Sequence, residues 1–271
     1  MFDVIVVGTG LFGSTIAHAL AKDGASVLTI DDLRPDSGSR PAACLMRPSW
    51  FSGLGKEVYD PALETLSELF GVEEISFKVL KGNVSVFWCD PRNILLRPSV
   101  QARVTKIEGV GSGYEVSLLK HEPMKARAVV LATGVWAPQL ARMDELPVGQ
   151  AGMACLWPDA TIDQPFIHVW APYKQVTAFN RGDGLWVGDS NSVRWDKWSE
   201  SSAQKTERRC SVAINQLTVK PQRLFGVRPY VNRKPCYLEE ANPNFWVATG
   251  GAKNGTIAAA WCAHKLRKIL S

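Results

Sequence analysis

The sequence lacks the features that mark membrane-spanning, secreted or zinc-binding proteins. No apolar run approaches the roughly 18 residues of a membrane-crossing helix, and the first run, Val4 to Val7, begins too soon after Met1 to leave room for a signal peptide. The six cysteines stand singly, without a CxxC pair or a Cys/His cluster at ligand spacing. We therefore expect a cytoplasmic protein with reduced, mostly buried thiols, no bound metal and no membrane partner.

Composition and charge are those of an ordinary globular protein. Hydrophobic residues make up 46% and charged residues 21% of the 271 positions, which is enough to bury a sizeable core in one or two domains. The net charge of +5 is mildly basic. It permits an anionic substrate or a nucleic-acid partner but demonstrates neither, and it predicts no oligomeric state.

The stretch from Phe2 to Asp31 predicts the opening of a dinucleotide-binding βαβ unit. A short apolar run, a glycine-rich turn, an alanine-rich helical stretch and a second apolar run follow one another. Gly8 is expected to make the tight turn, Gly10 to let the backbone approach a pyrophosphate, and Gly13 to let the helix pack closely on the strand. The spacing of Asp31 suits a bond to a ribose hydroxyl, which favours FAD or NAD over NADP.

A second glycine-rich turn stands near the end of the chain. Phe245 to Ala248 is predicted to be a strand, Gly250 to Gly255 a turn, and Thr256 to Leu270 a helix whose N-terminus points toward an electron-rich group. Between the two turns, a buried strand from Ala128 to Ala132 ends at Thr133-Gly134. Gly134 would let the backbone pass close to a ligand.

The middle of the chain predicts an antiparallel sheet rather than further βαβ units. Strand patterns occur at 75–88, 166–170, 175–179 and 185–188, a helix at 201–217, a short helix at 42–46, and a loop at 226–230. The fold class is therefore α/β, with a Rossmann-like FAD-binding domain interleaved with a reduced antiparallel-sheet substrate domain. The FAD-binding domain is assigned to 1–45, 95–147 and 225–271, and the substrate domain to 46–94 and 148–224.

Four pieces of the sequence resemble the D-amino-acid oxidase superfamily, and within it the glycine oxidase and sarcosine oxidase branch. They are Val4 to Asp31, Ala132 to Trp136, Gly226 to Pro229, and Phe245 to Ala260. The resemblance implies FAD and oxidation of a C–N bond next to a carboxylate, with hydride transfer to flavin N5 and O2 as acceptor. Covalent attachment would need Cys236, whose surroundings do not match the family, so we expect non-covalent FAD.

The resemblance also implies roles for individual residues. Arg228 matches the arginine that grips the substrate carboxylate, a job that suits the guanidinium fork. Lys253 is placed near the pyrimidine end of the flavin, and Tyr230 and Tyr173 are further pocket candidates. The expected cofactor contacts are Gly8, Gly10, Leu11, Phe12, Gly13, Asp31, Asp32, Arg40, Ala43, Val104, Thr133, Gly134, Trp136, Gly226, Arg228, Gly251, Lys253, Asn254, Gly255 and Thr256.

Departures from the family bear on the substrate. The chain is shorter than typical members between 34 and 100, which predicts an open pocket, and Arg194 to Trp198 interleaves tryptophans with cations. One superfamily member oxidises a carboxymethylaminomethyl group on tRNA uridine, and its loop resembles Ser37 to Ala43. The amine is therefore either free or tethered to a nucleic-acid base. The alternatives are an NAD-dependent dehydrogenase and a non-catalytic partner subunit that carries flavin or binds nucleic acid.

Overall fold

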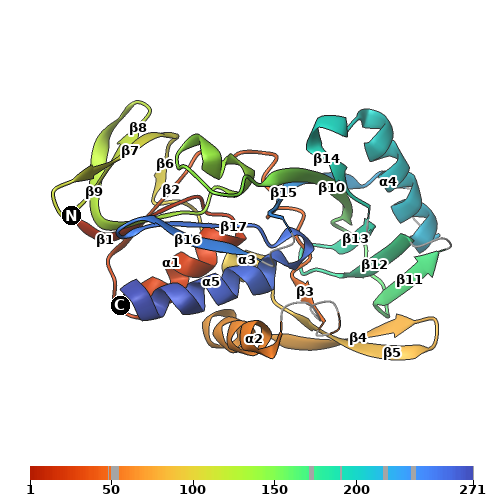
Figure 1. The fold of residues 1–271 in the computed structure, drawn as a ribbon. Helices are drawn as coiled ribbons and strands as arrows, with labels where there is room; N and C mark the ends of the chain where they lie inside the picture. Colours follow the sequence, from red (N-terminus) through yellow and green to blue (C-terminus); the bar gives the residue numbers. More distant parts are fainter. Residues whose placement is uncertain are drawn as a thin grey trace.

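The computed structural model describes residues 1–47, 49, 55–170, 174–189, 191–215, 219–232 and 236–270. Over these residues the chain forms two sheets that lie side by side, with helices on the outer faces (Figure 1). The strands of the first sheet come from both ends and the middle of the chain, and those of the second come from the segments between. The α/β fold class with two interleaved parts is confirmed, while the domain boundaries stay a prediction.

The first sheet has eight strands among the described residues, and its centre is parallel. β1 pairs in parallel with β2 on one side and with β9 on the other, and β9 pairs in parallel with β17. The strands are β1 (Phe2–Val7), β2 (Val27–Asp31), β6 (Val100–Gln101), β7 (Val104–Val110), β8 (Gly113–Leu118), β9 (His121–Leu131), β16 (Tyr237–Asn242) and β17 (Phe245–Thr249).

Both faces of β1 are covered, which explains its continuous apolar run. Val4 and Val6 pack against the helices α1 (Leu11–Lys22) and α5 (Gly255–Leu270), whereas Ile5 and Val7 face a core that includes strands β7 and β8. The other helices on this side are α2 (Lys56–Phe70) and the short α3 (Pro91–Ile94). The sheet is thereby held between two apolar layers, with the carboxyl ends of its strands left open.

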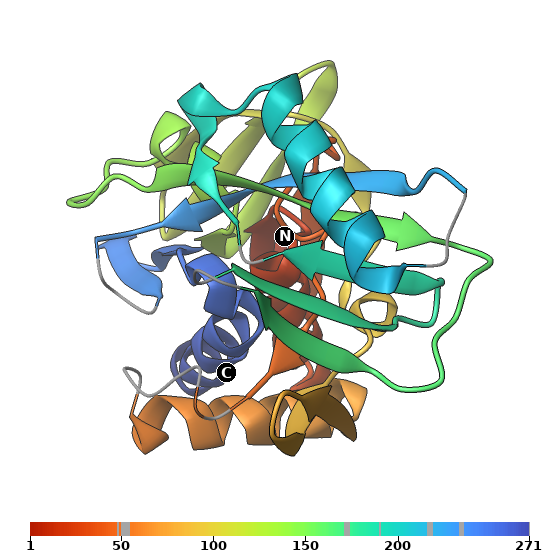
Figure 2. The ribbon, with the colours of Figure 1, turned by 90° about the vertical axis from the view of Figure 1, so that its right-hand side faces the viewer.

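The second sheet has nine strands within the described ranges and is mostly antiparallel. Helix α4 (Glu200–Ile214) lies across one face of it, where Ala203 and Cys210 pack against Cys155 and Val187 (Figure 2). The strands are β3 (Leu45–Met46), β4 (Glu73–Val79), β5 (Gly82–Trp88), β10 (Val148–Trp157), β11 (Phe166–Trp170), β12 (Lys174–Asn180), β13 (Leu185–Asp189), β14 (Val193–Arg194) and β15 (Gln222–Tyr230).

Two local predictions are wrong. The expected loop at 226–230 is the end of β15, which pairs with β10 over nine positions. Pro229 is tolerated there because β15 has β10 on one side and, opposite Val227, only an isolated bridge to Ser37 on the other. The expected helix at 42–46 is extended chain that ends in β3.

Three short 3-10 helices complete the described structure: η2 (Gly134–Gln139), η3 (Trp195–Lys197) and η4 (Ala252–Asn254). No helix in the described part of the chain is long and apolar enough to cross a bilayer. All six cysteines are buried as free thiols, as expected from their isolated positions in the sequence.

Candidate functional site

A cavity of about 1120 Å³ opens where the two sheets meet. Its walls come from the carboxyl ends of β1, β2, β9 and β17, from the segment between β2 and β3, and from the inner faces of β10, β12, β13 and β15. This volume is slightly above the usual range for small-molecule and cofactor sites, roughly 300–1,000 Å³. The cavity can therefore hold a long ligand that extends from one sheet to the other.

The first glycine-rich turn is built as its spacing predicts. Gly8 has a positive φ of 98°, and a Cβ atom there would lie 2.5 Å from the carbonyl oxygen of Ala132. A Cβ atom on Gly13 would collide with the carbonyl oxygen of Gly8, so this glycine lets α1 pack on β1 and does not line the cavity. Gly10 does line it, and the space of its missing Cβ lies 2.7 Å from Oγ of Ser39.

Carboxylates mark the end of β2 beside this turn. Asp31 accepts hydrogen bonds from the amide of Thr9 at 2.5 Å and from its hydroxyl at 3.0 Å. Asp32 forms ion pairs with Arg34 at 3.1 Å and with Arg103 at 3.4 Å. Both carboxylates line the cavity, and the spacing of Asp31 from the glycine-rich turn predicts a ribose beside it.

The second glycine-rich turn is hydrogen-bonded to the segment that follows β9. Gly250 and Gly251 have positive φ angles of 90° and 79°. The hydroxyl of Thr249 donates to the carbonyl of Gly134 at 3.0 Å, which ties this turn to the end of β9. Gly251 itself does not line the cavity, because it packs against Gly255, whose Cα would lie 2.9 Å from an added Cβ atom.

Most of the expected cofactor residues therefore surround one space. Apart from Gly13 and Gly251, all of them line the cavity: Gly8, Gly10, Leu11, Phe12, Asp31, Asp32, Arg40, Ala43, Val104, Thr133, Gly134, Trp136, Gly226, Arg228, Lys253, Asn254, Gly255 and Thr256.

Two cations lie at the end of the cavity formed by the second sheet. Arg228 projects from β15 across β10, with Nη2 2.5 Å from the position of a Cβ atom at Gly152. Burial lowers the pKa of Arg228, and the charge of Asp189 opposes that shift. Burial also lowers the pKa of Lys253, the charge of Arg228 lowers it further, and Asp189 again opposes the change. Arg228 and Lys253 are therefore close enough to each other and to the carboxylate of Asp189 for their charges to interact.

Asp189, at the end of β13, is a residue of the site that the sequence did not predict. Its side chain is 1% exposed, forms an ion pair with Arg209 of α4, and accepts the amide of Asn191 at 3.1 Å. Gln175 and Thr177 of β12 also line the cavity and were missed. They could have been predicted as a pair, because residues two positions apart on a strand point to the same face of the sheet.

Of the two tyrosine candidates, Tyr230 is not brought to this site. Tyr230 ends β15 opposite Val148 and does not line the cavity. Tyr173 lies outside the described residues.

Comparisons with known proteins agree with this geometry. A family model described as DAO, FAD-dependent oxidoreductase, matches residues 100–269, which is more than half of the chain. The chain therefore belongs to the DAO family of FAD-dependent oxidoreductases, and this favours FAD over the NAD alternative. A sequence comparison with curated proteins found no match.

Solved structures share the fold at low sequence identity. Iminodiacetate oxidase from Chelativorans sp. BNC1 is 13% identical with a TM-score of 0.72, over 98% of this chain and 95% of that one. Glycine oxidase from Bacillus cereus is 15% identical with a TM-score of 0.72, over 100% and 95%. L-α-glycerophosphate oxidase from Mycoplasma pneumoniae, crystallised with FAD bound, is 13% identical with a TM-score of 0.70, over 99% and 94%.

Proposed function

We propose that this protein oxidises the C–N bond of glycine or of a glycine-like amine. The observation that carries the proposal is the guanidinium of Arg228, which projects into the cavity over Gly152 at the end formed by the second sheet. A guanidinium binds both oxygens of a carboxylate in one plane, so Arg228 would hold the acid group and fix the direction of the neighbouring carbon. Glycine oxidase and iminodiacetate oxidase, which share the fold, are named for substrates of this kind.

The residues present fit FAD in the cavity. Gly8 and Gly10 add no side chain at the α1 N-terminus, where the Ser39 hydroxyl accepts a hydrogen bond from the backbone amide of Leu11 at 2.9 Å, and α5 also begins at the cavity wall. Helix N-termini bind phosphate through free N–H groups and the helix dipole, so we infer that the pyrophosphate lies at these turns and a ribose near Asp31. Cys236 does not line the cavity, which supports non-covalent binding.

Bound FAD would supply the two-electron chemistry of the reaction, with N5 as the hydride acceptor and O2 as the final oxidant that is reduced to hydrogen peroxide. The substrate carbon loses the hydride and its nitrogen loses a proton, so an imine forms that water then hydrolyses. No side-chain base is required if the amine arrives neutral. The cation of Lys253, placed by η4 at the cavity wall, would stabilise negative charge that develops during the reaction.

The substrate is either a free amine or a glycyl group carried on a nucleic-acid base. Support for the second form comes from Trp195, which is 40% exposed and meets the cavity-lining Trp136 edge-on at 6.0 Å. Arg34 lies over the ring of Trp136 at 4.6 Å. Exposed aromatic rings beside cations stack bases and contact phosphates, so this corner of the cavity mouth is where a carrier would rest.

A visible spectrum tests the proposal. The protein as purified should show flavin absorbance, and anaerobic addition of the correct amine should bleach it. We would compare glycine, sarcosine, iminodiacetate and an oligonucleotide that carries a glycyl-modified base, and then measure peroxide after air is admitted. Bleaching by the oligonucleotide alone would select the tethered form, whereas a flavoprotein that no amine reduces would contradict the proposal.

A further inference from the structure

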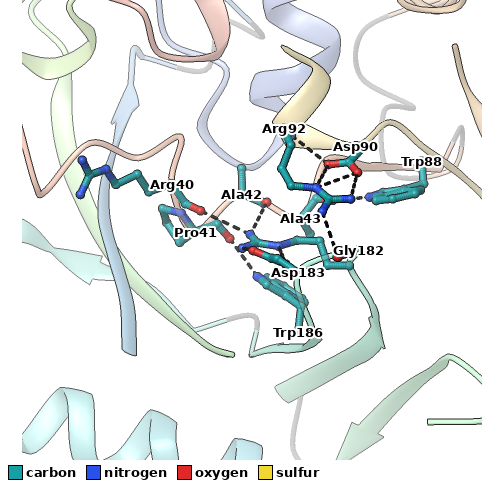
Figure 3. A network of polar contacts seen from close by, with 11 residues as sticks. Arg40, Pro41, Ala42, Ala43, Trp88, Asp90, Arg92, Gly182, Asp183 and Trp186 are labelled. Carbon is teal, nitrogen blue, oxygen red and sulfur yellow. Dashed lines mark hydrogen bonds and ion pairs between the residues drawn. The ribbon is translucent and has the colours of Figure 1, made fainter. Parts of the chain in front are cut away.

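Four consecutive carbonyl groups of the cavity wall are held by side chains of the second sheet (Figure 3). They belong to the segment from Arg40 to Ala43, which we call the wall segment. Arg181 Nη1 donates to the carbonyls of Arg40 at 3.3 Å and Ala42 at 3.1 Å, Trp186 Nε1 donates to that of Pro41 at 3.1 Å, and Trp88 Nε1 donates to that of Ala43 at 3.0 Å.

Arg181 is fixed in place before it reaches the wall segment. It stands in the turn between β12 and β13, is 5% exposed, and donates to the two oxygens of Asp183 at 2.8 and 2.6 Å. A second layer supports the same turn, where Arg92 is held by both oxygens of Asp90 and donates to the carbonyl of Gly182 at 2.9 Å. A buried arginine whose guanidinium makes all of these hydrogen bonds is held in one conformation.

We propose that Arg181 and Trp88 are positioning residues for FAD. Neither lines the cavity, so neither touches a ligand there. Their bonds turn the carbonyl oxygens of the wall segment toward the second sheet and fix its path, so the wall is already shaped when FAD arrives. Preorganisation of this kind raises affinity by removing an ordering cost. Arg181 and Trp88 thereby contribute to cofactor binding from the second sheet without contacting the cofactor themselves.

The inference rests on the proposed place of FAD in the cavity and not on the identity of the amine, so it is tested without substrate. We would prepare apoprotein, titrate it with FAD well below the unfolding temperature, and record affinity and visible spectrum for Arg181→Ala, Arg181→Lys and native protein. Arg181→Ala should bind FAD about tenfold more weakly, the loss expected for broken charge-assisted bonds, and should shift the flavin bands. Arg181→Lys should recover part of the affinity.

The matched control is Arg223→Ala. Arg223 lies on β15 and forms ion pairs with Glu200 at 2.7 Å and Glu207 at 2.6 Å, away from the cavity. Its loss should leave FAD affinity and spectrum unchanged. An Arg181→Ala protein that unfolds at lower temperature yet binds FAD with native affinity and spectrum would overturn the inference.

Trp88→Phe keeps the test decisive if Arg181→Ala does not fold. It removes one N–H donor to Ala43 and keeps a ring in the space where Trp88 packs edge-on to Phe179, 6.0 Å away. We expect FAD to bind about fivefold more weakly, as for loss of a neutral hydrogen bond, with a shifted spectrum. Native affinity and spectrum in this variant would equally overturn the inference.

Discussion

The guanidinium of Arg228 rests on the backbone of β10 at Gly152, with Nη2 2.5 Å from the place of a Cβ atom. Gly152→Ala should therefore push the guanidinium out of position without changing the charge of the site. We expect kcat/KM for the amine to fall about tenfold, mainly through KM, because part of a charge-assisted interaction is lost. Steady-state peroxide production measures the effect.

The matched control for this change is Gly109→Ala. Gly109 lies on β7, where an added Cβ atom would meet no atom within 4 Å, so activity should stay native. A double-mutant cycle provides the sharper check: in an Arg228→Ala background, Gly152→Ala should have little further effect. Additive losses would mean that residue 152 acts on the substrate directly and not through Arg228.

Removal of the Arg228 guanidinium should cost more than its displacement. Arg228→Ala is expected to lower kcat/KM by about 100-fold or more, because a carboxylate would enter a cavity without its partner. Arg228→Lys should recover only part of this loss, since an ammonium cannot bind both oxygens in one plane. Rates come from the initial rate of peroxide release.

Retention of FAD is the control in this series. Both Arg228 variants should keep the flavin spectrum, because the two glycine-rich turns are untouched. A yellow Arg228→Ala protein with native kcat/KM would show that another group holds the substrate.

The pH dependence of turnover should report Lys253. Burial and the charge of Arg228 lower the pKa of Lys253, so it loses its proton at a lower pH than an ordinary lysine, whose pKa is about 10.4. If the ammonium is needed, kcat should fall as pH rises through that lowered pKa. The measurement is a kcat profile on the alkaline side.

Lys253→Met isolates this effect. The kcat of the variant should be lower at neutral pH. It should lack the decrease in kcat at alkaline pH that deprotonation of Lys253 causes in the native protein. An identical alkaline fall in native protein and variant would assign the titration to the substrate amine or to another residue.

Local signals in the sequence were enough to predict the glycine-rich turns on one side of the cavity. Gly8 has a positive φ angle of its own backbone, Gly13 packs on Gly8 within the same βαβ unit, and the run Val4 to Val7 is buried on both faces as such units require. The helix α5 could be predicted for the same reason, because the glycine-rich turn that precedes it adjoins it in the sequence. These features depend on residues close in sequence, so they could be predicted.

The side of the cavity formed by the second sheet depends on contacts between residues far apart in the sequence, which no local pattern carries. Gly226 and Pro229 suggest a loop, yet nine pairings with β10, about 70 positions earlier, make that stretch a strand. The meeting of Arg228 with Gly152 follows from that register, and the burial of Asp189 follows from the docking of α4. Arg181 looked like one polar residue in a turn, because the carbonyls it binds lie 139 and 141 positions away.

Arg267 provides a prediction about stability that is independent of the cavity. From α5 it bonds Asp23, which follows α1, at 2.8 and 2.6 Å, and Glu68 of α2 at 2.6 Å. Arg267 and then Lys22 hold the pKa of Glu68 at about 2. Arg267→Met should lower the free energy of unfolding by about 1 kcal/mol at neutral pH, the upper end for exposed ion pairs.

The pH window of that loss follows from the direction of the shift. A carboxylate whose pKa is lower in the folded protein stabilises it above the unfolded value, about 4.3, and ceases to do so as pH falls toward about 2. The difference between native and Arg267→Met proteins in urea denaturation should therefore shrink across this window. Lys106→Met is the control, because Lys106 pairs only with the exposed Glu108 on the same strand among the ion pairs described, and its effect should be near zero throughout. A difference for Arg267→Met that persists undiminished at the acid end would mean that the stem of the arginine stabilises the three helices by packing, and that its charge does not.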